Sequence, residues 1–330
     1  MILIFSNAED FSTHRVMQWL KRAGKQVLRL NYDEPCKFEF EFSSNSQPTT
    51  IRVKREDRPW VDFQNLSAVW YRRVRRVWNV DGEAYSQFQS IQTRYYGHTL
   101  ADYLEAEWKV AYDFLLKQAS QCGRVLGHPQ HGQFNKLEQL VAAKSVGISI
   151  PISRVTTDAN RLVMAGKETI TKPLSDPTEF MVSNHNFRTY TAKVDDTWVE
   201  HVPDEVFPSY VQESIPKDVE LRIYYLDGKC YSMAIFSQRN KQTTVDFRRY
   251  DKVVPNRMEP YQLPEEVEEK IRLLMRQLDL NQGAIDFILT PAGEYVFLEV
   301  NPTGSFGMIS SNCHFPIEQD IAHWLMQSEY

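Results

Sequence analysis

The chain has 330 residues, of which 42% are hydrophobic and 25% are charged, and its formal net charge is −5. These values are ordinary for a soluble globular protein of one to three packed lobes, and the acidic balance gives no reason to expect nucleic acid as a partner. The sequence contains no long apolar run and no basic-then-apolar leader, so we expect neither a membrane partner nor secretion. Cys36, Cys122, Cys230 and Cys313 form no CxxC pair, which favours reduced thiols in a cytoplasmic protein over a zinc site or a disulfide framework.

The first thirty residues predict a strand, a helix and a second strand. Met1–Phe5 is a short apolar run, Ser12 can cap a helix that ends at Gly24, and Gln26–Leu30 is apolar again. This order is a βαβ start, which is typical of an α/β domain. No GxGxxG sequence follows the first strand, so no motif supports dinucleotide binding.

The remainder of the chain is predicted to contain both strands and helices, with a domain boundary near Cys122-Gly123. A well-marked helix begins at Pro264, where acidic first-turn residues precede a regular apolar stripe. The other predicted elements, in chain order, are strands at 38–42, 51–55 and 66–71, a helical pattern at 83–119, a helix from Asn135 to Gly147, and strands at 148–155, 169–172, 209–212, 220–226 and 230–237.

Residues 283–303 predict a β-hairpin that carries two acidic side chains on one face. A Pro-Ala-Gly turn separates two strand-like runs. If Thr290 pairs with Tyr295 across a four-residue loop, Asp286 lies directly opposite Glu299, with their Cβ atoms about 5 Å apart. A change of one residue in the loop would reverse this register.

The face that Asp286 and Glu299 share also carries Asn301. Two like charges opposed on a partly buried sheet are destabilising unless a cation lies between them, and oxygen ligands of this kind suit Mg²⁺ that also binds phosphate and water. The structural alternative is one protonated carboxylate, or two that face solvent. The opposite face is predicted to be core and consists of Ile285, Phe287, Leu289, Val296, Leu298 and Val300.

Two lysines occupy positions that favour a bound anion. Lys172 ends a strand-like segment just before Pro173, where an ammonium group is costly to bury without a partner. Lys136 opens a helix, where the helix dipole disfavours a cation. Each is more often a solvated lysine, but the pair beside a magnesium site favours a nucleoside triphosphate.

Two strand segments have both a structural and a functional interpretation. Residues 209–216 could leave an exposed backbone edge that recognises adenine through hydrogen bonds. Glu220 and Arg222 could instead form only a cross-strand ion pair, which is worth little if it is exposed.

Two basic segments also have alternative interpretations. Trp70–Trp78 interleaves arginines with aromatic residues, and it fits a domain interface or a peptide carboxylate at least as well as nucleic acid. Residues 235–250 form either a solvated basic loop or a contact for phosphate and acyl-phosphate charge. The basic residues crowded together there are Arg239, Lys241, Arg248 and Arg249.

The order of these motifs resembles that of the ATP-grasp ligases over residues 120–310. Ser67–Arg73 and Ser237–Tyr250 look like the microviridin-type peptide macrocyclases, also called graspetide synthetases, and the first residues look most like the peptide maturase of grasp-with-spasm systems. The matching ATP-grasp positions are Asn135-Lys136, Lys172-Pro173, Val211-Gln212-Glu213, Glu220-Leu221-Arg222, Asp286 and Glu299-Val300-Asn301-Pro302.

The resemblance implies an α/β fold of the α+β ATP-grasp type. An N-terminal βαβ pre-ATP-grasp domain at 1–120 would be followed by two α+β lobes that clamp ATP, at 121–205 and 206–330, the last with the metal site. The implied cofactors are ATP and Mg²⁺, and the implied assembly is a homodimer. The resemblance implies that Lys136 and Lys172 bind phosphate, that Glu220 binds the ribose, and that the adenine is bound by Gln212, Glu213, Ser214 and Ile215. It implies that the catalytic residues Arg222, Arg239 and Arg248 contact the γ-phosphate and the acyl phosphate. The implied Mg²⁺ ligands are Asp286, Glu299 and Asn301.

The implied activity is ATP-dependent ring closure within a ribosomally made precursor peptide that has a leader and a core. An Asp or Glu carboxylate of the peptide would become an acyl phosphate, and a Ser or Thr hydroxyl or a Lys amine would then form an ω-ester or an ω-amide. Two alternatives stay open. One is an ATP-grasp ligase that adds an amino acid to a protein carboxylate, and the other is a nucleotide-binding regulator without catalysis.

Overall fold

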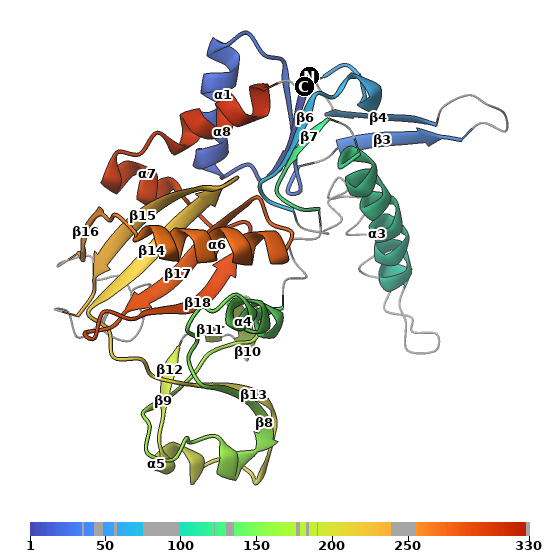
Figure 1. Cartoon of the computed structure of the whole chain (residues 1–330). Helices are drawn as coiled ribbons and strands as arrows, with labels where there is room; N and C mark the ends of the chain where they lie inside the picture. The colour runs from blue at the N-terminus through green and yellow to red at the C-terminus, as the bar shows by residue number, and fades with distance from the viewer. Residues whose placement is uncertain are drawn as a thin grey trace. The chain divides into compact units, whose positions relative to one another are not determined.

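The computed structural model of the chain describes residues 1–34, 36–42, 49–55, 58–74, 100–121, 123–129, 135–175, 179–182, 185–189, 191–238 and 255–327 (Figure 1). The chain divides into two compact units. Unit 1 comprises Met1–Gln133, Ser305–Gly307 and Pro316–Tyr330, and unit 2 comprises Phe134–Gly304 and Met308–Phe315. The division into three domains at residues 120 and 205 stays a prediction.

Unit 1 is built on a parallel sheet with the strand order β2-β1-β6-β7. Every residue of β1 and β6 is buried, as expected for the central strands of a parallel sheet that is covered on both faces. Helix α1 lies between β1 and β2 in the chain, so the predicted βαβ start is confirmed. The strands are β1 (Ile2–Ser6), β2 (Val27–Asn31), β6 (Ala68–Tyr71) and β7 (Arg124–Leu126).

Helix α1 (Phe11–Arg22) begins two residues earlier than the sequence predicts. The side chain of Asp10 accepts a hydrogen bond from the backbone N–H of Thr13 at 2.9 Å, so Asp10 is the N-cap and Ser12 lies within the first turn. The helix contacts α8 (Ile317–Met326), which also contacts β6.

An antiparallel sheet with the order β3-β4-β5 packs with α3 to complete the core of unit 1. The predicted pairing of the alternating phenylalanine strand with the next strand is confirmed, because Phe38 lies opposite Val53. Of the helical pattern predicted at 83–119, the structure describes α3 over Leu100–Ala119, and the remainder lies outside the described residues. The strands are β3 (Cys36–Glu41), β4 (Thr50–Arg55) and β5 (Val61–Asp62), and a short 3₁₀ helix follows at Phe63–Asn65.

The first part of unit 2 is a small sheet with the strand order β12-β9-β13-β8. Apart from this sheet, β10 pairs with β11 as an antiparallel hairpin. The elements are β8 (Ser153–Asp158), a 3₁₀ helix (Ala159–Arg161), β9 (Thr169–Thr171), β10 (Glu179–Val182), β11 (His185–Arg188), β12 (Ala192–Val194), α5 (Asp196–Val199) and β13 (Glu205–Glu213).

A second, antiparallel sheet of unit 2 has the order β16-β15-β14-β17-β18, and α6 lies across it (Figure 1). Apolar residues of this sheet, of α4 and of α6 form one core, with Ile271 and Leu274 of α6 fully buried. Helix α4 begins at the predicted position, because the Asn135 side chain accepts from the N–H of Leu137. The elements are α4 (Lys136–Ser145), β14 (Val219–Leu226), β15 (Lys229–Phe236), β16 (Arg257–Pro260), α6 (Glu265–Gln277), β17 (Gln282–Leu289), β18 (Tyr295–Asn301) and α7 (Gly307–Cys313).

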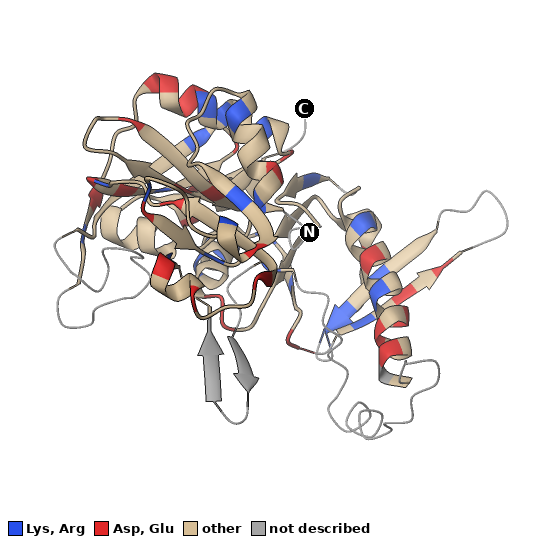
Figure 2. Ribbon diagram, turned by 90° about the horizontal axis from the view of Figure 1, so that it is seen from below, with Lys and Arg blue, Asp and Glu red and all other residues tan. Residues whose placement is uncertain are grey.

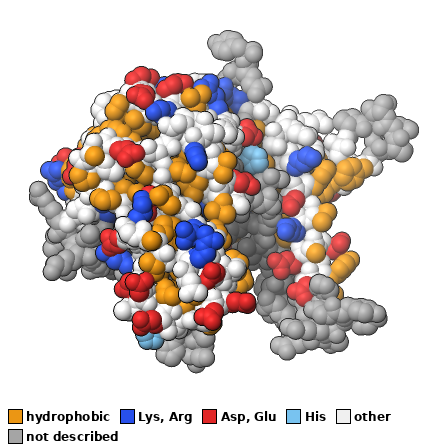
Figure 3. All heavy atoms as spheres, turned by 60° about the horizontal axis from the view of Figure 1, so that its bottom comes forward, with side chains coloured by type: hydrophobic (Ala, Val, Ile, Leu, Met, Phe, Trp, Pro, Cys, Tyr) orange, Lys and Arg blue, Asp and Glu red, His pale blue; other side chains and the backbone are white. Residues whose placement is uncertain are grey.

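Charged residues of both signs are interspersed along the ribbon, and α3 carries acidic and basic bands over its length (Figure 2). Apolar, acidic and basic side chains also alternate over the face drawn in Figure 3. Among the helices that the structure describes, none combines the length and the apolar character needed to cross a bilayer.

Candidate functional site

Three charged side chains form a row across the second sheet of unit 2. Arg222 of β14 pairs with Asp286 of β17, and Asp286 pairs on its other side with Glu299 of β18. Nη1 of Arg222 donates to both carboxylate oxygens of Asp286, at 2.8 and 3.0 Å. The three side chains are only 13% to 14% exposed. The predicted opposition of Asp286 and Glu299 is confirmed.

The turn of this hairpin is shorter than the sequence predicts. The N–H of Thr290 donates to the carbonyl of Glu294 at 2.9 Å, which leaves a three-residue loop. Gly293 adopts a φ of +80°, a left-handed conformation that glycine reaches without strain and that three-residue hairpin loops commonly use. The predicted pairing of Thr290 with Tyr295 is therefore wrong.

A β-bulge corrects the register before the strand reaches the acidic pair. Phe287 lies opposite Phe297, whereas the preceding residue, Asp286, lies opposite Glu299. Leu298 is consequently the extra residue on β18. Because the bulge shifts the register by one residue, the shorter loop still brings the two carboxylates face to face.

The bulge also changes which residues of β18 face the core. The rings of Phe287 and Phe297 are in edge-to-face contact, with centroids 5.6 Å apart, inside the main core of unit 2. Val296 lies opposite Ile288, and Leu298 helps to line a cavity. The prediction that Val296 and Leu298 share the core face with Phe287 is thus wrong.

Lys136, at the start of α4, lies beside the acidic row. Its Nζ donates to the carbonyl oxygens of Pro173 at 3.0 Å and Ser175 at 3.2 Å, and it lies 3.5 Å from Oε2 of Glu299. These oxygen atoms compensate the ammonium at a helix start, where the dipole disfavours it. Lys136 thereby links the segment that follows Lys172 to the edge of the second sheet.

Helix α4 is fastened to β18 by one buried amide. Gln139 donates from Nε2 to the carbonyl of Val300 and accepts from the N–H of Val300, both at 2.9 Å. The side chain therefore takes the place of a neighbouring strand along the edge of β18. Since Gln139 lies one helical turn after Lys136, this contact fixes Lys136 next to Glu299.

A cavity with walls from both sheets of unit 2 collects most of the residues that the sequence singles out. Lys136 and Asn301 are not among its lining residues. Arg239 and Arg248 lie outside the described residues, as does most of the basic segment at 235–250. The predicted site residues that line the cavity are Lys172, Gln212, Glu213, Ser214, Ile215, Glu220, Arg222, Asp286 and Glu299.

The strand that leads to the segment predicted to bind adenine is not a sheet edge. Strand β13 pairs with β8 on one side and with β9 on the other. The N–H of Ser214 donates to Glu168 at 2.7 Å, and the buried Gln212 side chain donates to the hydroxyls of Ser153 and Tyr210. The prediction of an exposed backbone edge is therefore wrong for β13 and for the N–H of Ser214.

Glu220 is a buried carboxylate on the cavity wall, two residues from Arg222 on β14. Its Oε1 accepts from Nζ of Lys217 at 2.8 Å and from Oγ of Ser237 at 2.6 Å. Burial raises the pKa of Glu220, and the nearby Lys217 ammonium opposes that rise. The cross-strand ion pair that the sequence allowed forms at Arg222, whose partner is Asp286 on β17, and Glu220 takes no part in it.

Sequence reasoning missed three charged residues that also line the cavity: Glu168, Lys193 and Lys217. Glu168 and Lys193 form an ion pair with each other, and both are more than half exposed. No spacing rule brings these two together, because they are 25 positions apart in the sequence. Lys217 had a local signal, since it precedes Glu220 by three residues.

The donor set fits magnesium in number and in kind. Asp286 and Glu299 offer two opposed carboxylates beside a cavity, and Mg²⁺ takes one or two protein carboxylates when phosphate and water complete its shell. The Oδ1 atom of Asn301 accepts from the N–H of Thr303 at 3.0 Å. Among the described residues no group of three His, Cys, Asp or Glu side chains could hold a metal, so any further ligands must come from other groups.

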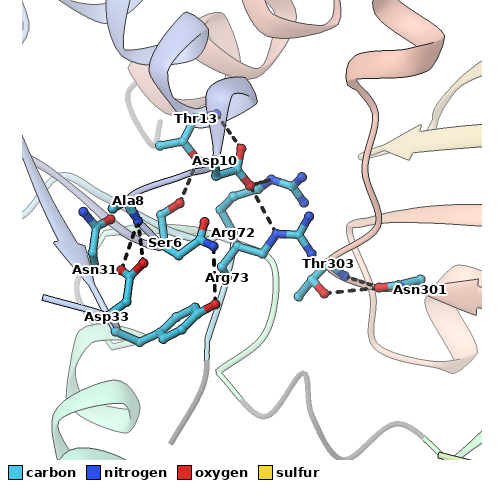
Figure 4. A network of polar contacts seen from close by, with 12 residues as sticks. Ser6, Ala8, Asp10, Thr13, Asn31, Asp33, Arg72, Arg73, Asn301 and Thr303 are labelled. Atoms are coloured by element: carbon cyan, nitrogen blue, oxygen red, sulfur yellow. Dashed lines mark hydrogen bonds and ion pairs between the residues drawn. The ribbon is translucent and has the colours of Figure 1, made fainter. Parts of the chain in front are cut away.

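Unit 1 has its own charged cluster, at the carboxyl end of β6, where the sequence predicted a domain interface or a carboxylate contact. Arg72 and Arg73 both point to the carboxylate of Asp10 (Figure 4), with their Nε atoms 3.1 and 3.2 Å from Oδ2. Arg72 is almost fully buried and Arg73 is 34% exposed. This cluster ties the end of β6 to the start of α1.

Comparisons with known proteins agree with this architecture. A family model described as the MvdD pre-ATP grasp domain matches residues 1–117. A search of curated protein sequences gave no match.

Solved structures similar to the whole chain include two at 25% sequence identity. The macrocyclase MdnC bound with precursor peptide MdnA, from Microcystis aeruginosa MRC, has a TM-score of 0.78 over 99% of both chains. A RiPP-associated ATP-grasp ligase from Chryseobacterium gregarium, in complex with ADP and a leader and core peptide, has a TM-score of 0.80 over 98% of this chain and 96% of that one. The macrocyclase MdnB from Microcystis aeruginosa MRC shares the fold at 24% identity and a TM-score of 0.72, over 98% of both chains. The expected resemblance to ATP-grasp macrocyclases with an N-terminal pre-ATP-grasp domain is confirmed.

Proposed function

We propose that this protein is an ATP-dependent ligase that closes rings within a ribosomally made precursor peptide. The observation that carries the proposal is the convergence of Lys172, Glu220 and the row Arg222, Asp286 and Glu299 on one cavity. Two proteins similar to nearly the whole chain are described as bound to a precursor peptide, or to ADP with a leader and a core peptide. Cavity chemistry and similarity therefore favour the same class of reaction.

The cavity suits a nucleoside triphosphate if its two ends take different parts of the ligand. We assign the adenine to the segment 212–215, where β13 ends, and the ribose to Glu220. We assign the phosphates to Lys172 and Lys136, because their ammonium groups can donate hydrogen bonds to phosphate oxygens. We assign the transferred phosphoryl group to Arg222, with Arg239 and Arg248 as further contacts for it.

The proposed reaction has two steps. A peptide carboxylate attacks the γ-phosphorus of ATP, the bond to the β-phosphate oxygen breaks, and an acyl phosphate and ADP form. A Ser or Thr hydroxyl or a Lys amine of the same peptide then attacks the acyl carbon, gives up its proton and releases phosphate, leaving an ω-ester or an ω-amide.

The protein's contribution to both steps is positioning and charge. The guanidinium of Arg222 donates two hydrogen bonds to Asp286, so it is oriented before a substrate arrives. Bound Mg²⁺, held by Asp286 and Glu299 with Asn301 as a candidate third ligand, would neutralise charge on the phosphate oxygens. Neither step requires a covalent intermediate on the enzyme.

The test is mass spectrometry of the full-length protein incubated with Mg·ATP and a candidate precursor peptide rich in Thr, Ser, Asp and Glu. We expect the peptide to lose the mass of one water for each ring, with one ADP released each time. A peptide or protein that instead gains the mass of an amino-acid residue would identify the alternative ligase. Peptide-independent nucleotide binding without any ADP release would identify a regulator.

The assembly and location form a separate part of the proposal. The implied homodimer can be tested by light scattering of the purified protein, which should give twice the mass of the 38.7 kDa chain. A cytoplasmic location fits cysteines that carry no predicted disulfide framework.

A further inference from the structure

The two oxygens of the Glu220 carboxylate have different surroundings. Oε1 accepts hydrogen bonds from Lys217 at 2.8 Å and from Ser237 at 2.6 Å. Oε2 receives none from the part of the chain that the structure describes. Glu220 and Lys217 both line the cavity, with side chains 11% and 9% exposed, and Ser237 is buried.

The difference between the two oxygens matters because keeping a buried carboxylate charged and free to rotate costs free energy. Each oxygen accepts about two hydrogen bonds, so the two donors on Oε1 use its capacity and fix the plane of the group. The ammonium of Lys217 also opposes the rise in the pKa of Glu220 that burial causes. What is left is one acceptor oxygen at a fixed place in the cavity wall.

We propose that Lys217 and Ser237 are positioning residues that hold Oε1 of Glu220, so that Oε2 accepts a hydrogen bond from a ribose hydroxyl of the bound nucleotide. The inference rests on the proposed function in that it takes the cavity to bind ATP. It goes further because it assigns two residues that do not touch the nucleotide in this scheme, and it makes sugar recognition depend on them.

The test compares the dissociation constants of ATP, 2′-deoxy-ATP and 3′-deoxy-ATP, measured by competition against a fluorescent ADP analogue at fixed Mg²⁺ with no peptide present. In the wild type we expect at least one deoxy nucleotide to bind about tenfold more weakly than ATP or worse, since a hydrogen bond to a charged acceptor is lost. Lys217→Met should reduce this ratio to within about threefold of unity, mainly by weakening ATP.

Three further variants distinguish a positioning role from a general loss of nucleotide binding. Ser237→Ala removes one of the two donors on Oε1 and should lower the ratio by a smaller factor. Lys217→Met in a Glu220→Gln background should lower it no further, because the two residues act through one carboxylate. The matched control is Lys270→Met, which breaks an exposed lysine–glutamate pair of similar length on α6, with Nζ of Lys270 2.7 Å from Glu266, and it should keep the wild-type ratio.

A wild-type ratio in Lys217→Met and Ser237→Ala would overturn the inference, as would a wild type that binds all three nucleotides equally. A wild type that binds no ATP would overturn both this inference and the nucleotide site of the proposed function. Loss of sugar discrimination in Lys217→Met alongside a peptide that never loses water would support the positioning role while refuting the peptide chemistry. The two failures are therefore distinguishable.

Discussion

The amide variants of the two opposed carboxylates give the sharpest test of the metal assignment. Asp286→Asn and Glu299→Gln each remove one negative charge and keep the size of the side chain. Both should lower ATP turnover by more than about a hundredfold, because loss of a ligand costs at least as much as loss of the groups around a metal site. Their effects on stability should differ, since the two carboxylates have different protein partners.

The difference in stability follows from the contacts. Arg222 donates to both oxygens of Asp286 at 2.8 and 3.0 Å, and a hydrogen bond to a charged group is worth about 1.5–3 kcal/mol against about 0.5–1.5 kcal/mol for a neutral one. Asp286→Asn should therefore lower the free energy of unfolding by about 1–2 kcal/mol. Lys136 lies 3.5 Å from Glu299 and keeps two carbonyl partners, so Glu299→Gln should cost less than about 1 kcal/mol.

Urea denaturation gives the stability of each variant, and ADP release with a cognate peptide gives its turnover. Turnover at the wild-type level in either variant would refute the metal assignment. Equal destabilisation by the two changes would refute the argument from the Arg222 contacts. A third variant, Glu266→Gln, removes an exposed carboxylate of α6 and should leave both measurements unchanged.

Three other predictions concern the parts that hold the site in place. Gln139→Leu leaves the N–H and the carbonyl of Val300 without the hydrogen bonds that Gln139 makes to them. The free energy of unfolding, measured by urea denaturation, should fall by about 2–4 kcal/mol, and a loss below about 0.5 kcal/mol would contradict the anchoring role. Burial by itself would raise the pKa of Asp10, but the Arg72 and Arg73 charges and the Thr13 N–H hold that pKa below its usual value, so the stabilisation is present at neutral pH and is lost as the pH falls below about 4. Acid titration of unfolding should show this loss in the wild type and less of it in Asp10→Asn, and identical acid profiles would argue against it. Deletion of Leu298 removes the bulge while keeping Asp286 opposite Glu299, so magnesium-dependent ATP binding should stay within about tenfold of the wild type; complete loss of that binding would show that the bulge itself shapes the site.

The position of the acidic pair could be predicted because it depends on local rules. Alternation of side chains along a strand puts Glu299 and Asn301 on one face, and a short Pro-Ala-Gly turn limits the register of the hairpin. The same local logic gave the start of α4 at Asn135 and the βαβ order of the first thirty residues. Each of these inferences needs only neighbouring residues.

The predicted register was right at Asp286 for a reason that was only half correct. The loop has three residues rather than four, and the bulge at Leu298 compensates. Neither feature has a clear signal in the sequence, because Leu298 is as apolar as its neighbours. The structure shows the compensation in the core, where Phe297 takes the place predicted for Leu298.

Partners that come from distant strands could not be predicted. Asp286 meets Arg222 because β14 pairs with β17, and the residues are 64 positions apart, with β15, β16 and α6 between them among the described residues. The alternation of polar and apolar residues within one strand does not determine which strands become its neighbours in an antiparallel sheet. Glu220 likewise accepts a hydrogen bond from Ser237, which directly follows β15 in the chain.

The charge arrangement explains why opposed carboxylates are tolerated in this sheet. Asp286 already shares its charge with Arg222, and Glu299 already lies within reach of Lys136, so the pair does not depend on a metal ion for its stability in the way that the sequence alone suggested. A cation that binds between the carboxylates must therefore share them with two side-chain cations. Triphosphate oxygens can take up the positive charge of Arg222 and Lys136 when they arrive, which lowers the competition for the carboxylates. Magnesium and nucleotide should thus strengthen each other's binding, which suits the proposed ligase reaction because that reaction needs both.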